Sequence, residues 1–207
     1  MRSNNEGTHC PHLRFSKILR RWVNTNIRFA NEGYDKPWYY NERALISLFA
    51  GAVWVEGGLA LEEFSAYKRT GKKRKSLYSG RSDLYLKIGR DHFIAEIKHT
   101  YSGAARVGPK TATYIQDKLD KACADIRKCP PEKQRKLGIL FAIPYFSKSH
   151  IRRGGKKQMD EKLNKWVTIM KEHMEYSCAA WVFPKEARDF GDKTDFYPGI
   201  AVFIKEV

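Results

Sequence analysis

Apolar side chains recur along much of the chain at the spacing of a helix that buries one face. In residues 16–26, for example, Ile18, Leu19, Trp22 and Val23 fall on one stripe. The same reasoning predicts helices over 16–26, 37–53, 111–128 and 156–174.

Shorter apolar runs between these helices predict strands. The run over 136–146 is almost continuous, which is typical of a strand buried on both faces. Strands are expected over 58–68, 82–88, 92–99 and 136–146, with two more in the last 30 or so residues. The pattern predicts an α/β or α+β fold, a central mixed sheet flanked by helices.

The two strands in residues 82–99 predict a hairpin with a definite register. If paired residue numbers sum to 181, every pair on one face is apolar. These pairs are Leu84 with Ile97, Leu86 with Ala95, and Ile88 with Phe93.

The opposite face of this hairpin carries charged residues, which are depleted in strands. The predicted register places Asp83 across from Lys98, with Glu96 on the diagonal. Two carboxylates with an ammonium between them suit Mg²⁺, with Asp83 and Glu96 as metal ligands and Lys98 orienting a water. The alternative is an Asp83–Lys98 ion pair worth about 0.2–1 kcal/mol, with Glu96 merely exposed.

The segments GRSDLYL and FIAEIK resemble the PD-(D/E)xK phosphodiesterase superfamily, the restriction-endonuclease-like nucleases. Asp83 stands at the aspartate of the motif, and Glu96-Ile97-Lys98 at its (D/E)xK, while Ser82 replaces the usual proline. The order of predicted elements over 37–146 is also similar to the core of that family.

The resemblance implies a restriction-endonuclease-like core with catalytic Asp83, Glu96 and Lys98. It also implies that the backbone carbonyl of Ile97 completes the metal shell. Many members carry a further acid on the first core helix, and Glu42 is the matching residue here. The alternative for Glu42 is a helix-dipole role in the first turn after an Asn41 cap, worth about 0.3–1 kcal/mol.

No shift in composition marks a linker, so the 207 residues are expected to form a single nuclease-like domain. Residues 1–36 would be an N-terminal helical extension and 37–146 the core. Residues 147–207 would supply a C-terminal helix and strands that complete the sheet.

The net charge of the chain indicates what kind of partner it binds. The chain has 39 Lys and Arg against 23 Asp and Glu, a formal charge of +16, which suits a polyanion such as nucleic acid. An anionic membrane is the alternative, but no stretch approaches the ~20 apolar residues of a spanning helix. The polar N-terminus does not fit a signal peptide, so a cytoplasmic protein with four free cysteines is expected.

Basic residues gather in two stretches, 66–81 and 150–157. The first directly precedes Asp83, where a phosphate backbone would be steered, although a charge run is often only a solvated loop. The candidate nucleic-acid-binding residues are Lys68, Arg69, Lys72, Lys73, Arg74, Lys75, Arg81, Arg152 and Arg153.

Together these features predict a Mg²⁺-dependent nuclease, with Mn²⁺ as a substitute metal, that hydrolyses phosphodiester bonds. DNA is favoured over RNA because it is the usual substrate of the superfamily. Two other functions stay open: a catalytically inactive nucleic-acid-binding module with the same fold, and a basic accessory subunit that docks an acidic protein. Strand preference, endonuclease against exonuclease action, and a homodimer or larger complex are also open.

Overall fold

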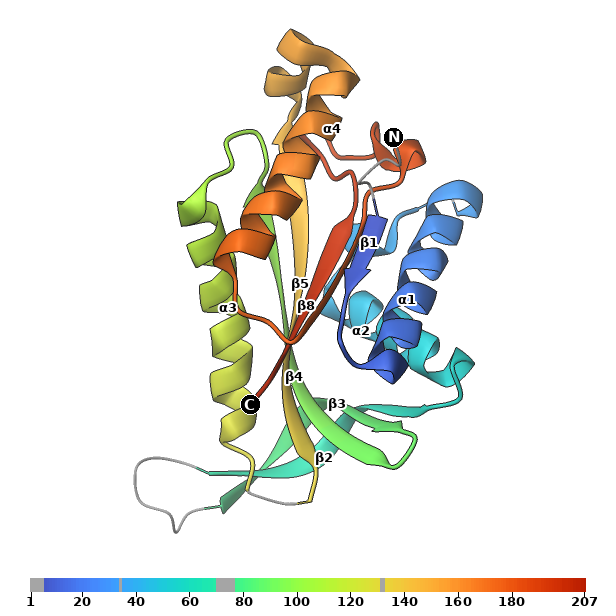
Figure 1. Ribbon diagram of the computed structural model, residues 1–207, viewed down its shortest axis with the longest axis vertical. Helices are drawn as coiled ribbons and strands as arrows, with labels where there is room; N and C mark the ends of the chain where they lie inside the picture. The colour runs from blue at the N-terminus through green and yellow to red at the C-terminus, as the bar shows by residue number, and fades with distance from the viewer. Residues whose placement is uncertain (1–5, 34, 70–76, 131–132) are drawn as a thin grey trace.

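A computed structural model describes residues 6–33, 35–69, 77–130 and 133–207, and for residues 13, 69, 77, 78 and 152–157 it describes the backbone alone. Its centre is an eight-stranded mixed sheet with helices on both faces (Figure 1). The predicted mixed sheet flanked by helices is therefore confirmed.

Seven strands follow one another across the sheet in the order β1-β6-β8-β5-β4-β3-β2, and β7 pairs with β5. Only β4 and β5 run parallel among the pairs of described strands. The strands are β1 (Glu6–His9), β2 (Leu59–Arg69), β3 (Leu77–Ile88), β4 (Asp91–Gly103), β5 (Arg135–Ser147), β6 (Cys178–Val182), β7 (Asp195–Phe196) and β8 (Ile200–Glu206).

Two pairs of helices cover the two faces of the sheet. Parallel neighbours need a crossover connection, and α3 provides it between β4 and β5. The helices are α1 (Leu13–Glu32), α2 (Glu42–Val55), α3 (Pro109–Arg127) and α4 (Lys148–His173), with short 3₁₀ turns at Pro37–Tyr39 and Lys185–Ala187.

The predicted helices and strands are all present, most of them longer at their ends. The helix expected over 37–53 is the main exception, because a 3₁₀ turn precedes α2 and the helix begins at Glu42. The strands β1 and β7 were not predicted, since four and two residues are too short to show an alternating pattern.

Each face of the sheet has its own apolar core. On the α1/α2 face, Ala95 and Ile97 of β4 pack with Leu45 and Phe49 of α2. Successive side chains of a strand point to opposite faces, so Glu96 and Lys98 lie on the α3 face. The strand β5 contributes to both cores, as its continuous apolar run predicts.

The register predicted for the β3–β4 hairpin is wrong by two residues. The observed pairs join Leu84 to Ala95, Leu86 to Phe93 and Ile88 to Asp91. The turn itself sets this register: Gly89 has a φ of 64°, a conformation that glycine accepts at no steric cost, and it takes the first position of a two-residue turn. A shift of two residues keeps every side chain on its predicted face.

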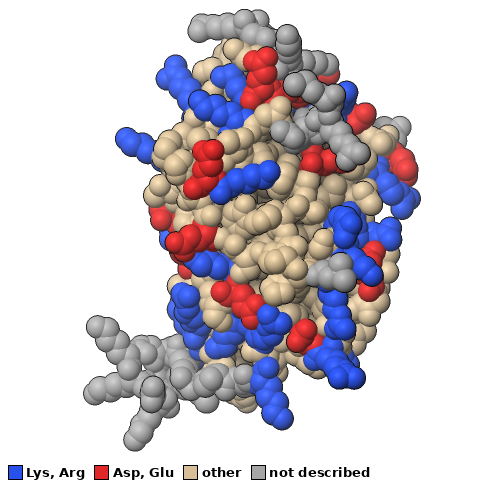
Figure 2. Space-filling model, in the orientation of Figure 1, with Lys and Arg blue, Asp and Glu red and all other residues tan. Residues whose placement is uncertain are grey.

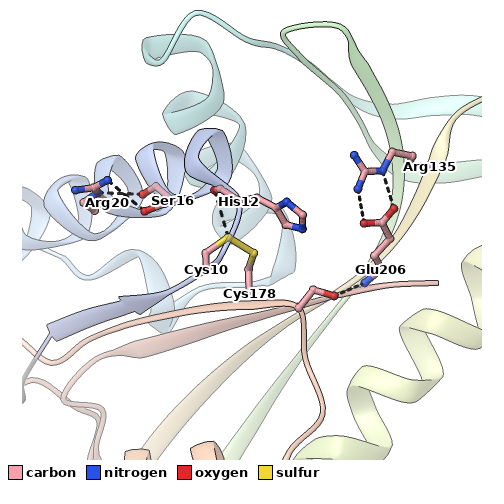
Figure 3. Close-up of a disulfide and its surroundings, with 8 residues drawn as sticks. Cys10, His12, Ser16, Arg20, Arg135, Cys178 and Glu206 are labelled. Carbon is pink, nitrogen blue, oxygen red and sulfur yellow. Dashed lines mark hydrogen bonds and ion pairs between the residues drawn. A yellow bond between two sulfur atoms is a disulfide. The ribbon is translucent and has the colours of Figure 1, made fainter.

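The expectation of four free cysteines is also wrong. Cys10 and Cys178 form a disulfide, with Cα atoms 4.4 Å apart and 168 residues between them in sequence (Figure 3). The bond arises because β1 lies beside β6, with His9 paired to Ala179, a neighbourhood that spacing along the chain does not reveal. Cys123 and Cys129 are free and buried.

We expect this disulfide to contribute to the stability of the folded protein. A cross-link that closes a long loop restricts the unfolded chain, so Cys178→Ser should lower the free energy of unfolding by about 2–4 kcal/mol. Urea unfolding followed by circular dichroism measures the change. Wild-type protein in a thiol reductant should show the same loss, and the variant should not respond to the reductant; equal stability of oxidised and reduced wild type would contradict the prediction.

Candidate active site

The hairpin strands β3 and β4 separate at one point, and Asp83 lies there. Their last described pair is Leu84 with Ala95; beyond it β4 continues along β5 to Gly103, while β3 stays with β2. The carboxylate of Asp83 spans the separation, since its Oδ2 accepts a hydrogen bond of 2.7 Å from the backbone N–H of Ile97. The side chain of Asp83 thus accepts the hydrogen bond that a backbone carbonyl of β3 would otherwise accept, and this bond holds the side chain in place.

The backbone is distorted on the other side of Asp83 as well. Between the pairs Glu62–Leu84 and Phe64–Ser82, Glu63 has a φ of 49°. This left-handed conformation is uncommon for a residue other than glycine and costs on the order of 1–3 kcal/mol. Strain of this kind gathers at functional sites, which marks the surroundings of Asp83 as a candidate.

Glu96 is the second carboxylate, and it is only 4% exposed. Its Oε1 lies 2.6 Å from Nζ of Lys68 and accepts a hydrogen bond of 3.3 Å from the hydroxyl of Ser82. Lys68 is therefore paired inside the site, whereas the sequence predicts it only as a nucleic-acid contact. Ser82 carries no predicted role, although it precedes Asp83 directly.

Burial makes both carboxylates costly to ionise. It raises the pKa of Asp83, against the hydrogen bond from Ile97 and the charge of Lys98, and the charge of Glu42 raises that pKa further. Burial also raises the pKa of Glu96, against its hydrogen bond from Lys68 and with help from the charge of Asp83. A half-buried Asp83 and a buried Glu96 whose charges repel each other form a site that a cation would stabilise.

Burial acts to lower the pKa of Lys68, but the interaction with Glu96 outweighs this effect. Alone it would lower the pKa of Lys68, yet the hydrogen bond and charge of Glu96 raise that pKa above its ordinary value overall. The ammonium of Lys68 therefore stays charged beside Glu96.

Lys98 does not face Asp83 across the hairpin, and the reason is the shifted register. Its Nζ lies 3.5 Å from Oδ2 of Asp125 on α3, and its side chain is 35% exposed. Asp125 also binds Lys128 at 2.6 Å. The charge of Lys98 still lowers the pKa of both Asp83 and Glu96, so the three residues form one electrostatic group.

Glu42 approaches from α2 and lies both in the first turn of that helix and beside β4. The side chain of Asn41 caps the helix by accepting a hydrogen bond of 3.3 Å from the N–H of Ala44, which places Glu42 in the first turn. Its Oε2 also lies 3.2 Å from Nδ1 of His99, the residue after Lys98 on β4. His99 was not predicted, although it follows the motif directly.

The basic stretches are only partly covered by the structure. Lys72, Lys73, Arg74 and Lys75 lie outside the described residues, as do the side chains of Arg69, Arg152 and Arg153. Arg81 is described: its side chain is 74% exposed and lies 3.2 Å from Glu63.

The charge of +16 does not form one continuous patch on the face shown in Figure 2, where Lys and Arg alternate with acids around an uncharged centre. Several of these cations lie at the lower end, where Figure 1 places the ends of β2 and β3. Within the described ranges, no helix is long and apolar enough to cross a membrane.

The side chains around Asp83 meet part of what a metal ion needs. In the part of the chain that the structure describes, no three His, Cys, Asp or Glu side chains gather into a metal cluster. Mg²⁺, however, is often held by one or two carboxylates together with substrate phosphates and waters. Asp83 and Glu96 fit that requirement, and the carbonyl of Ile97 points to the same side of β4 as its N–H, toward Asp83.

Comparison of the chain with protein-family models, curated proteins and solved structures finds no match.

The raised pKa of Asp83 predicts how Asp83→Asn changes stability. A carboxyl whose folded pKa is raised contributes stability that is present at low pH and is lost as pH rises through that pKa. Asparagine removes the charge and keeps an oxygen for the N–H of Ile97. The variant should be more stable than wild type at neutral pH, and the difference should vanish as pH falls below the ordinary value of 3.8.

Urea unfolding at a series of pH values measures this difference. Asp117→Asn, at an exposed position on α3, is the matched control and should show no such trend. A variant of Asp83 that is less stable than wild type at neutral pH would show that the carboxylate serves the fold rather than a site.

Proposed function

We propose that the protein is a Mg²⁺-dependent nuclease that hydrolyses phosphodiester bonds in nucleic acid, with DNA favoured over RNA and Mn²⁺ able to replace Mg²⁺. The observation that carries the proposal is the meeting of Asp83 and Glu96 where β3 leaves β4, with the amide of Ile97 fixing Asp83. Glu96 is buried and Asp83 is half-buried, and Lys98 lies close enough for its charge to lower the pKa of both.

The arrangement of elements supports a restriction-endonuclease-like core. Helix α2, the strands β2, β3 and β4, helix α3 and strand β5 follow in the order that the sequence resemblance implies. They bring the two motif segments together on neighbouring strands and place the first turn of α2 beside β4.

Each residue then has a defined part. Asp83, Glu96 and the carbonyl of Ile97 would hold the metal, which supplies Lewis-acid stabilisation of the attacked phosphate. Lys98 offsets the negative charge that builds up on the phosphate and orients the attacking water. His99 orients Glu42, which is the accessory acid. The charge of Glu42 acts on Asp83 by raising its pKa.

One observation favours a second candidate, a catalytically inactive module that binds nucleic acid. Glu96 already holds the ammonium of Lys68, and Lys98 is turned toward Asp125. A module of this kind would bind polynucleotide equally well in Mg²⁺ and in EDTA, whereas a nuclease requires the metal for cutting.

The nuclease proposal predicts loss of cleavage without loss of binding in Lys98→Ala. Wild type and variant are incubated with plasmid, linear duplex, single-stranded DNA and RNA, each with Mg²⁺ or EDTA. Wild type should cut only with metal, and the variant should cut about 10²-fold or more slowly, since one group that stabilises transition-state charge is commonly worth that much.

Lys17→Ala, an exposed position on α1, is the control for loss of a positive charge and should cut like wild type. Undiminished cutting by Lys98→Ala would refute the role given to Lys98. Binding without cutting by wild type under every condition would favour the inactive module.

A further prediction concerns Arg81, two residues before Asp83. If Arg81 contacts a phosphate, Arg81→Ala should make the slope of log affinity against log salt shallower by about 0.9 for duplex DNA. Arg28→Ala is a close control, because Arg28 is 75% exposed and pairs with Glu32 much as Arg81 pairs with Glu63. Fluorescence anisotropy over a salt series measures both slopes; equal slopes in the two variants would exclude Arg81 from the interface.

A further inference from the structure

Lys68 forms an ion pair with Glu96, one of the two carboxylates that the proposed metal requires. It comes from β2, two strands away from β4 in the sheet, and pairs in register with Tyr78 of β3. Figure 1 shows the far ends of β2 and β3 passing below the lower end of α3. A residue from this end of β2 thus reaches Glu96, with only 13% of the lysine side chain and 5% of the glutamate side chain exposed.

The hydrogen bonds to Glu96 engage only one of its two carboxylate oxygens. Both the ammonium of Lys68 and the hydroxyl of Ser82 bind Oε1, and one carboxylate oxygen has two lone-pair directions. A divalent cation on the other oxygen of Glu96 would still lie within a few ångströms of the ammonium. In a partly buried site the repulsion between the two cations is weakly screened.

We propose that Lys68 and a divalent cation exclude each other at Glu96, and that a phosphate group of the polynucleotide draws the ammonium of Lys68 away so that metal can bind. This inference rests on the proposed nuclease function and adds a regulation of the same site. Phosphate is the suitable competitor because it offers the ammonium a second anion beside the site, next to the exposed Arg81.

The consequence is that metal and polynucleotide bind cooperatively. Without polynucleotide the protein should bind metal weakly, because the metal must displace the ammonium of Lys68. With polynucleotide the metal affinity should rise, and by linkage metal should raise polynucleotide affinity by the same factor. Removing the ammonium by mutation should give the higher metal affinity with no polynucleotide present.

Calorimetric titration with MnCl₂ tests this directly and needs no cleavage. Wild type, Lys68→Gln, Lys68→Met and the charge control Lys17→Gln are titrated alone and with a phosphorothioate oligonucleotide that resists hydrolysis. Glu96→Gln with the same oligonucleotide measures Mn²⁺ bound outside the site. Lys68→Met retains the aliphatic part of the side chain, and circular dichroism verifies that each variant is folded.

Both Lys68 variants should bind Mn²⁺ more tightly than wild type by roughly 5- to 150-fold, the usual range of coupling between sites. The oligonucleotide should raise the affinity of wild type and Lys17→Gln by a similar factor beyond the gain that it gives the Lys68 variants, because in those variants only direct contact between phosphate and metal contributes. The wild-type titration does not depend on any variant folding.

Two results would count against the proposal in different ways. Mn²⁺ affinity that is the same in wild type and the Lys68 variants, changes equally in both with oligonucleotide, and is lost in Glu96→Gln would overturn the exclusion and leave the nuclease function standing. Absence of Mn²⁺ binding above the Glu96→Gln level in every protein, with and without oligonucleotide, would overturn both.

Discussion

The hydrogen bond from the amide of Ile97 to Asp83 is the contact on which the site depends. A sheet strand that leaves its neighbour exposes unpaired backbone groups, and each must find another partner. Here the partner is a carboxylate, so the irregularity in the sheet and the position of the first acid have the same cause. Glu96 is the residue before Ile97 on the same strand, so this one hydrogen bond keeps Asp83 beside the backbone that carries the second acid.

Much of the fold follows from the sequence because burial sets the spacing of apolar residues. The alternation of Leu84 and Leu86, and of Ala95 and Ile97, was enough to place the charged residues together on the opposite face. The pattern does not determine which residues of the two strands pair, because a shift of two residues leaves every side chain on the same face. The conformational need of Gly89 decided the register, and Lys98 lost its predicted partner as a result.

Contacts between distant parts of the chain were beyond prediction for a related reason. Neither the bond of Cys10 to Cys178 nor that of Lys68 to Glu96 has a local signal, because each depends on which strands become neighbours. The sequence shows Lys68 as one cation in a basic stretch. Only the folded sheet shows that it meets an acid, and that the positive charge of the chain therefore acts within the site as well as around it.

The disulfide at Cys10 also makes the two margins of the sheet unequal. At one margin, β1 is four residues long and is held covalently to its neighbour, which leaves little backbone for another chain to pair with. The opposite margin is β2, eleven residues long, with Leu59 and Leu61 each 58% exposed. Of the two margins, β2 therefore presents the longer backbone edge, and this edge belongs to the strand that delivers Lys68 to Glu96.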